Sequence, residues 1–124
     1  MRGRIRDERG AVVIFIAVAF VGLLALTAFV IDLGRLYSVR RELQKTADAS
    51  AFAAAAELAS PGAVTAEGVL YGQLNAPGAG TVVAPADVVS GYWDAGTETF
   101  APGGSPLNAV FVLAERSVAN GNPL

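Results

Sequence analysis

The side chains that could do chemistry are few, and their spacing fits no catalytic site. Histidine and cysteine are absent from all 124 residues, which removes the commonest general base and the thiolate nucleophile. None of the serines lies in the G-x-S-x-G sequence of a hydrolase nucleophile: Ser38, Ser50, Ser60, Ser90, Ser105 and Ser117. We therefore expect no enzyme activity, no cofactor, no metal and no small-molecule substrate.

Two weaker patterns lead to the same expectation. Asp94 and Glu98 flank a glycine-containing turn, but their spacing matches no EF-hand and they offer too few oxygen ligands for calcium. The glycine pairs at 78–80 and 103–104 lack the lysine and the helix start that a phosphate loop requires. The interpretation is a solvated hairpin tip at Asp94 and Glu98, and ordinary turns at the glycines.

A long apolar run dominates the first part of the chain. Residues 11–31 contain 21 consecutive residues without a charge, proline or amide, and a helix of that length spans about 30 Å, the thickness of a bilayer's hydrocarbon core. The alternative is a cleaved signal peptide, because residues 1–10 form a basic leader. Signal-peptide cores are shorter, about 7–15 residues, and the stretch from Ile31 to Arg35 holds no small-x-small cleavage site. The prediction is a retained transmembrane helix over 11–31.

Charge favours one orientation of this helix. Residues 1–60 carry eight Lys/Arg and six Asp/Glu, whereas residues 61–124 carry one arginine and five acids. Basic residues flank the run on both sides, but the leader is short and basic and the acidic part follows the run. We expect a cytoplasmic N-terminus and an extracytoplasmic C-terminal part. Nucleic-acid binding is not expected, because no basic cluster lies outside the flanks of the run.

The helix is predicted to continue beyond the membrane over residues 32–60, as a rod ending at Ser60-Pro61-Gly62. Mostly apolar and small residues recur at spacings of three and four and form one stripe along this helix. Arg41, Glu42, Lys45 and Thr46 are predicted to lie on other faces. The stripe consists of Leu36, Val39, Leu43, Ala47, Ser50 and Ala54. Small residues permit close helix packing, so Ala47, Ala51 and Ala54 are candidate contacts to a partner. The equally weighted alternative is that these alanines pack on the chain's own C-terminal module.

Three residues at the outer membrane boundary are further candidate contacts. Asp32 and Arg35 lie three residues apart on the helix, where side chains can pair. One interpretation is that they match charges on a partner helix, and the other, which we favour, is that they only mark the edge of the lipid. Tyr37 fits the interfacial aromatic belt under either interpretation.

Residues 61–124 are predicted to form a small α+β module with an antiparallel sheet. All six prolines and ten of the fourteen glycines lie here. The pattern predicts a short helix over 64–74, strands over 81–83, 88–93, 99–100 and 108–114, and a loop over 75–80.

Several stretches together resemble TadG-like proteins of bacterial Flp/Tad (tight adherence) pilus assembly. The likeness runs from Arg9-Gly10 through the apolar run, then through Asp32-Leu33-Gly34-Arg35-Leu36-Tyr37, Leu43-Gln44 and the alanine-rich stretch to residue 59. Downstream, Gly91-Tyr92-Trp93-Asp94, Thr99-Phe100 and Pro106-Leu107-Asn108-Ala109-Val110 resemble the extracytoplasmic region attached to this anchor. The resemblance implies a membrane-anchored structural component whose partners are the bilayer, other pilus or envelope proteins and, as an option, copies of itself.

Two departures from related proteins limit what is carried over. Longer members of the family have a larger domain with a metal site, which does not fit into this chain, and relatives usually continue beyond the position of Leu124. Type IV prepilins have a glutamate five residues after the cleaved glycine, whereas Phe15 stands there after Gly10, so fibre polymerisation is not expected.

The alternative function is an anchored envelope protein that binds a soluble partner or ligand through its C-terminal module.

Overall fold

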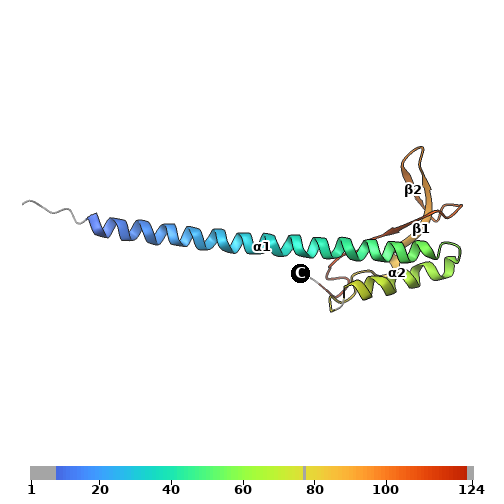
Figure 1. Ribbon diagram of the computed structural model, residues 1–124, viewed down its shortest axis with the longest axis horizontal. Coiled ribbons are helices and arrows are strands. Elements are labelled where there is room, and N and C mark those ends of the chain that lie inside the picture. Colours follow the sequence, from blue (N-terminus) through green and yellow to red (C-terminus); the bar gives the residue numbers. More distant parts are fainter. Residues whose placement is uncertain (1–7, 77, 123–124) are drawn as a thin grey trace, which may run out of the picture. The chain divides into compact units, whose positions relative to one another are not determined.

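The computed structural model describes residues 8–76 and 78–122 (Figure 1). The basic leader, apart from its last three residues, lies outside the described residues, as do Pro77 of the predicted loop and the last two residues. The elements are α1 (Glu8–Ala56), α2 (Pro61–Asn75), the short 3-10 helix η1 (Pro85–Asp87), β1 (Val88–Asp94), β2 (Thr99–Pro102) and β3 (Ala109–Val112). The chain divides into two compact units, Met1–Ser38 and Val39–Leu124. The predicted α+β class, with a long helix before a short helix and a small antiparallel sheet, is confirmed.

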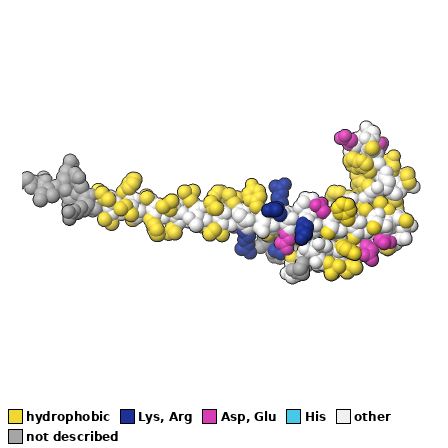
Figure 2. Space-filling view, in the orientation of Figure 1, with side chains coloured by type: hydrophobic (Ala, Val, Ile, Leu, Met, Phe, Trp, Pro, Cys, Tyr) yellow, Lys and Arg dark blue, Asp and Glu magenta, His cyan; other side chains and the backbone are white. Residues whose placement is uncertain are grey.

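The first unit presents apolar side chains along α1, and Figure 2 shows them on one side of the helix. The large hydrophobic residues from Val12 to Ile31 are 55–77 % exposed, and no residue of the most apolar window is buried. By its length and composition, α1 qualifies as a membrane-spanning helix. A run this exposed gains little from packing within the chain.

The boundary between the two helices differs slightly from the predicted one. The first helix ends at Ala56, before the predicted stop at Ser60-Pro61-Gly62. Glu57 to Ser60 form turns in which the Ser60 N–H donates to the Glu57 carbonyl at 2.7 Å. Pro61 is the first residue of α2, three residues before the predicted start. Proline is well suited to this position because its missing N–H has no partner in the first turn of a helix.

In the second unit, α2 runs back alongside the end of α1 (Figure 1). Small residues, among them Ala54 and Gly68, line the contact. Ala54 is fully buried in a cluster with Val64, Val83 and Val88. A Cβ on Gly68 would lie 2.9 Å from Val88 Cγ1 and 3.3 Å from Ala54 Cβ, so only glycine fits there without displacing a neighbour. The Ser50 hydroxyl donates to the Gly68 carbonyl at 2.6 Å. This buried hydrogen bond fixes the register of the two helices.

Thr46 was assigned to the wrong face by its polarity. Its side chain is fully buried, one turn before Ser50 on the same stripe as Ala54. The hydroxyl donates to the Glu42 carbonyl at 2.9 Å, so the backbone of the same helix satisfies the buried hydroxyl. A pattern based on hydropathy alone misses a polar residue that is satisfied in this way.

The predicted strand at 81–83 is also wrong, although its residues are important for the core. Val82 and Val83 are fully buried but lie in an irregular segment, and the Val82 carbonyl accepts one hydrogen bond from the Glu115 N–H at 2.9 Å. Asn122 is buried beside this segment and donates to the carbonyls of Ala79 at 3.1 Å and Thr81 at 2.7 Å. The β-branched composition here reflects burial, not a ladder of strand hydrogen bonds.

The three strands form an antiparallel sheet in the order β2-β1-β3. Trp93 pairs with Phe100 of β2, and Val89 pairs with Phe111 of β3. The predicted strands over 88–93 and 99–100 are confirmed, and the one over 108–114 is confirmed for its central residues, Ala109–Val112. One face of the sheet, which includes Val88, packs on the helices because Gly68 leaves room for the Val88 methyl groups.

The predicted hairpin tip between β1 and β2 is present. The Asp94 carboxylate accepts hydrogen bonds from the N–H groups of Gly96 at 2.8 Å and Thr97 at 3.4 Å. Hydrogen bonding from the Gly96 N–H first, and then from the Thr97 side chain, lowers the pKa of Asp94 below its usual value. Glu98 has a φ of 51°, a left-handed conformation that closes the turn. The chemistry at the tip is that of a turn.

Candidate interaction site

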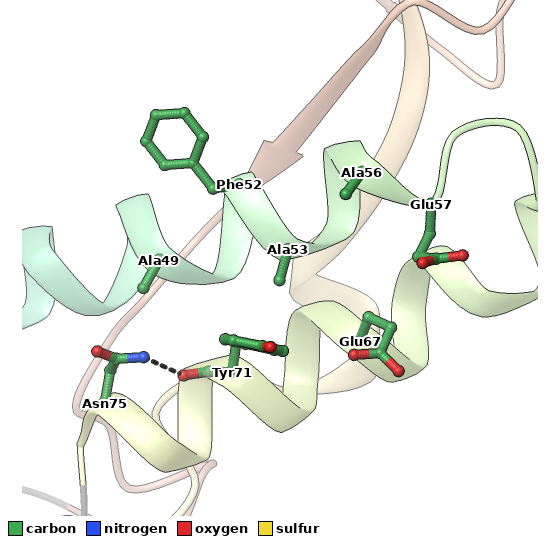
Figure 3. A pocket seen from close by; sticks show the side chains of 8 residues that line it. All are labelled: Ala49, Phe52, Ala53, Ala56, Glu57, Glu67, Tyr71 and Asn75. Carbon is green, nitrogen blue, oxygen red and sulfur yellow. Dashed lines mark hydrogen bonds between the residues drawn. The ribbon is translucent and has the colours of Figure 1, made fainter.

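A groove runs between the last turns of α1 and the facing side of α2, within the second unit (Figure 3). Its volume is about 520 Å³. It is lined by Ala49, Phe52, Ala53, Ala56, Glu57, Glu67, Tyr71 and Asn75. The three alanines have short side chains on the α1 side of the groove, so a partner side chain or helix can approach the α1 backbone closely.

Two aromatic side chains give the groove its apolar character. Phe52 is 81 % exposed and points outward from α1, and Tyr71 lies between the two helices (Figure 3). An exposed phenylalanine of this size has no role in the chain's own core. Exposed aromatic side chains next to a groove are typical anchors of protein–protein contacts.

The charged residues that line the groove, Glu57 and Glu67, are both acidic. Glu57 and Glu67 lie near the turn that joins the helices, and at the other end the Asn75 amide donates to the Tyr71 carbonyl at 2.9 Å (Figure 3). Residues 46–115 contain no lysine, arginine or histidine. The two carboxylates therefore lack a cation from the stretch of chain that builds the groove. An apolar partner segment with a basic residue at this end matches both features.

The predicted site residues do not gather at this groove. Asp32, Arg35 and Tyr37 are exposed on the part of α1 that belongs to the first unit. Ala47 and Ala51 are half-buried, and Ala54 is fully buried in the core of the second unit. A bulky substitution at Ala54 would therefore report on folding and not on partner binding.

Sequence reasoning missed Phe52, Tyr71 and the two glutamates as a group. The one available signal was Phe52, a single aromatic residue inside an alanine run and off the predicted stripe. The groove itself depends on how α2 returns along α1, which local patterns do not define.

Comparison with known families identifies the chain. Residues 10–57 match the TadE/G-like Flp pilus-assembly family, and residues 34–121 match the Tad-like Flp pilus-assembly family. The second match covers 88 of the 124 residues. The chain belongs to the Tad-like Flp pilus-assembly family. The resemblance to TadG-like proteins is thus confirmed, and it extends through the sheet of the second unit.

Membership makes the chain a component of Flp pilus assembly, and this family is not a known enzyme family. The first match spans the apolar part of α1 and the alanine run. The second match covers all the residues that line the groove, from Ala49 to Asn75. Searches of curated proteins and of solved structures find no match to the chain.

Proposed function

We propose that the chain is a single-pass, membrane-anchored structural component of Flp/Tad pilus assembly. The observation that carries the proposal is the first unit, in which the large apolar side chains from Val12 to Ile31 are 55–77 % exposed. Burying one such side chain away from water contributes about 1.5–3 kcal/mol, so the whole run strongly favours lipid over water. Asp32 and Arg35 then mark the outer edge of the lipid, with Tyr37 in the interfacial region.

In this proposal the N-terminus is cytoplasmic and the second unit lies outside the inner membrane. The acidic balance of residues 61–124 and the short basic leader both support this orientation. The second unit then presents its groove to other pilus or envelope proteins. Its occupant is an apolar segment of such a protein that carries a lysine or arginine opposite Glu57 and Glu67.

Topology gives the first test. Alkaline phosphatase, which is active only outside the cytoplasm, is fused after Leu124 of the full chain, and a matched fusion is placed before Met1. We expect activity only from the C-terminal fusion, together with retention in membranes after an alkaline wash. Activity from the N-terminal fusion alone would reverse the orientation, and release by the wash would exclude an integral anchor.

The groove gives the second test. Phe52→Ala removes the exposed aromatic ring at the groove, and we expect it to lower co-purification of pilus-assembly partners at least tenfold, because aromatic anchors supply much of an interface's binding energy. Val118→Ala is the matched control, since Val118 is 83 % exposed but does not line the groove. Both variants should unfold at the wild-type denaturant concentration. Equal recovery of partners with Phe52→Ala and wild type would exclude the groove as the contact.

A further inference from the structure

The groove between α1 and α2 has helical spacing on both of its walls. On α1 the lining alanines stand at positions 49, 53 and 56, and on α2 Glu67, Tyr71 and Asn75 follow one another at intervals of four. Side chains at these intervals lie about one helical turn apart on the same side of a helix. At 1.5 Å per residue, each wall offers a contact about 10–12 Å long, which is the length of two turns of a partner helix.

Exposed apolar side chains continue the α2 wall beyond the groove itself. Leu70 is 46 % and Leu74 63 % exposed, and together with the half-exposed Tyr71 they occupy successive turns on one side of α2. On the other wall, Phe52 is exposed, and Ala53 points from α1 toward α2 (Figure 3). A partner seated in the groove therefore contacts large apolar side chains from both helices and short ones from α1.

The backbones of the two walls offer an extended segment few hydrogen-bond partners. Both walls are α-helical, from Ala49 to Ala56 and from Glu67 to Asn75, so most of their N–H and C=O groups are bonded within each helix. A strand laid in the groove would bury N–H and C=O groups that these walls leave unpaired, whereas a helix satisfies its own. Short side chains at a contact also allow helix axes to approach to about 8 Å. The lining therefore favours a helix over a strand.

The charges of the groove define one end of its occupant. Glu57 and Glu67 are half-buried and lie at the end near the turn between the helices, whereas Asn75 at the other end is uncharged (Figure 3). Partly buried like charges cost free energy unless an opposite charge matches them, and residues 46–115 contain no lysine, arginine or histidine. A lysine or arginine on the occupant supplies that opposite charge.

We infer that the occupant is an α-helix of another pilus-assembly or envelope protein, with apolar residues at intervals of three and four and a lysine or arginine at one end of this stripe. Such a helix packs on α1 and α2 together, in the helix-in-groove mode of recognition. The class of partner rests on the proposed function. What is added is the conformation of the bound segment and the end of it that carries the positive charge.

Substitutions in the full chain test the close approach and the charge match. Ala53→Leu is expected to lower recovery of the cross-linked partner about tenfold or more, because the added side chain keeps the two helices apart. Ala55→Leu is the matched control, since Ala55 is exposed on the same helix but does not line the groove. Glu67→Lys should cause a similar loss, and Glu98→Lys, at the exposed hairpin tip, should cause none. All four variants should keep the protease resistance of the wild type.

Photo-crosslinking distinguishes a helix from other occupants. The photo-reactive amino acid p-benzoylphenylalanine replaces Phe52 or Tyr71 in turn, in cells that carry the pilus-assembly system, and mass spectrometry locates the attachment sites on the captured protein. We expect the sites to fall within one segment of a different protein, separated by three, four or seven residues, as on one side of a helix. The same segment should carry a lysine or arginine within one turn of these sites.

Each other outcome has a definite consequence. Attachment sites separated by two residues would show an extended occupant and would overturn the helix, while leaving the groove and the role in pilus assembly intact. Attachment to a second copy of this chain, or unchanged recovery of the partner with Glu67→Lys, would overturn the assigned partner. No attachment at either position in membrane-inserted protein would instead show that the groove is not the contact, which is a failure of the proposed function.

Discussion

Replacing both Leu23 and Leu24 by lysine is expected to prevent insertion of α1 and to move the chain out of the membrane fraction. These residues lie near the centre of the apolar run and are 61 % and 55 % exposed. On the scale measured for membrane insertion, each change from leucine to lysine near a helix centre costs about 3–4 kcal/mol. The two changes together therefore cost about 6–8 kcal/mol, enough to reverse an insertion equilibrium by several powers of ten.

The measurement is the fraction of chain that stays with membranes after an alkaline wash. Changing the same two leucines to valine keeps the run apolar and should leave that fraction unchanged. Because both leucines lie in the first unit, the groove and sheet of the second unit should keep their folded structure and protease resistance. If the double lysine variant stayed in washed membranes at the wild-type level, lipid would not be the environment of this run.

The sequence predicts the helical part of the fold well, because each decisive feature there is local. The run over 11–31 leaves only helix as a membrane-spanning structure, and the alanine-rich stretch contains strong helix formers. The hairpin is local as well, since Asp94 with Gly96 carries turn chemistry between two β-rich stretches. These elements appear in the structure with boundaries shifted by about three residues at the turn between α1 and α2.

The errors have a common cause in tertiary packing. Thr46 is polar and was expected on another face, but packing of the second unit buries it fully, and its hydroxyl is satisfied by the Glu42 carbonyl. Val82 and Val83 look like a strand because burial and strand formation favour the same residue types. In both cases the side chain's polarity and its preferred backbone conformation are visible in the sequence. Whether the side chain is buried depends on segments that are distant in the sequence.

The two surfaces were beyond local prediction for a related reason. Phe52 and Tyr71 line one groove only because Gly68 and Ser50 fix how α2 lies on α1. The outer face of the sheet, which carries Trp93 and Phe111, requires the register of all three strands, since a slip by one residue would turn these side chains toward the helices. Glycine and serine at these positions carry little predictive signal by themselves, although they determine which surfaces form.

Gly91→Ala is expected to destabilise the second unit more than any other single-methyl change in the sheet. A Cβ at this position would collide with the Ala101 carbonyl oxygen and lie 2.8 Å from Phe100 Cζ and 2.9 Å from Phe100 Cε2. The ring can rotate away, but the carbonyl belongs to the neighbouring strand, so relief requires β1 and β2 to separate locally. Overpacking of this kind typically costs about 1–3 kcal/mol, and a backbone collision places this variant at the upper end.

The chain supplies its own probe for this measurement, because Trp93 is its only tryptophan and lies two residues from Gly91 on β1. Unfolding of the full chain by urea in detergent, followed by Trp93 fluorescence, should show a midpoint lowered in proportion to the lost stability. Gly62→Ala is the matched control, since a Cβ there meets nothing within 4 Å and Gly62 lies in α2. That variant should be no less stable than the wild type, because Gly62 is the second residue of α2 and alanine favours a helix at least as well as glycine does. Equal midpoints for Gly91→Ala and wild type would show that the Phe100 ring and β2 do not close over Gly91 as the structure has them.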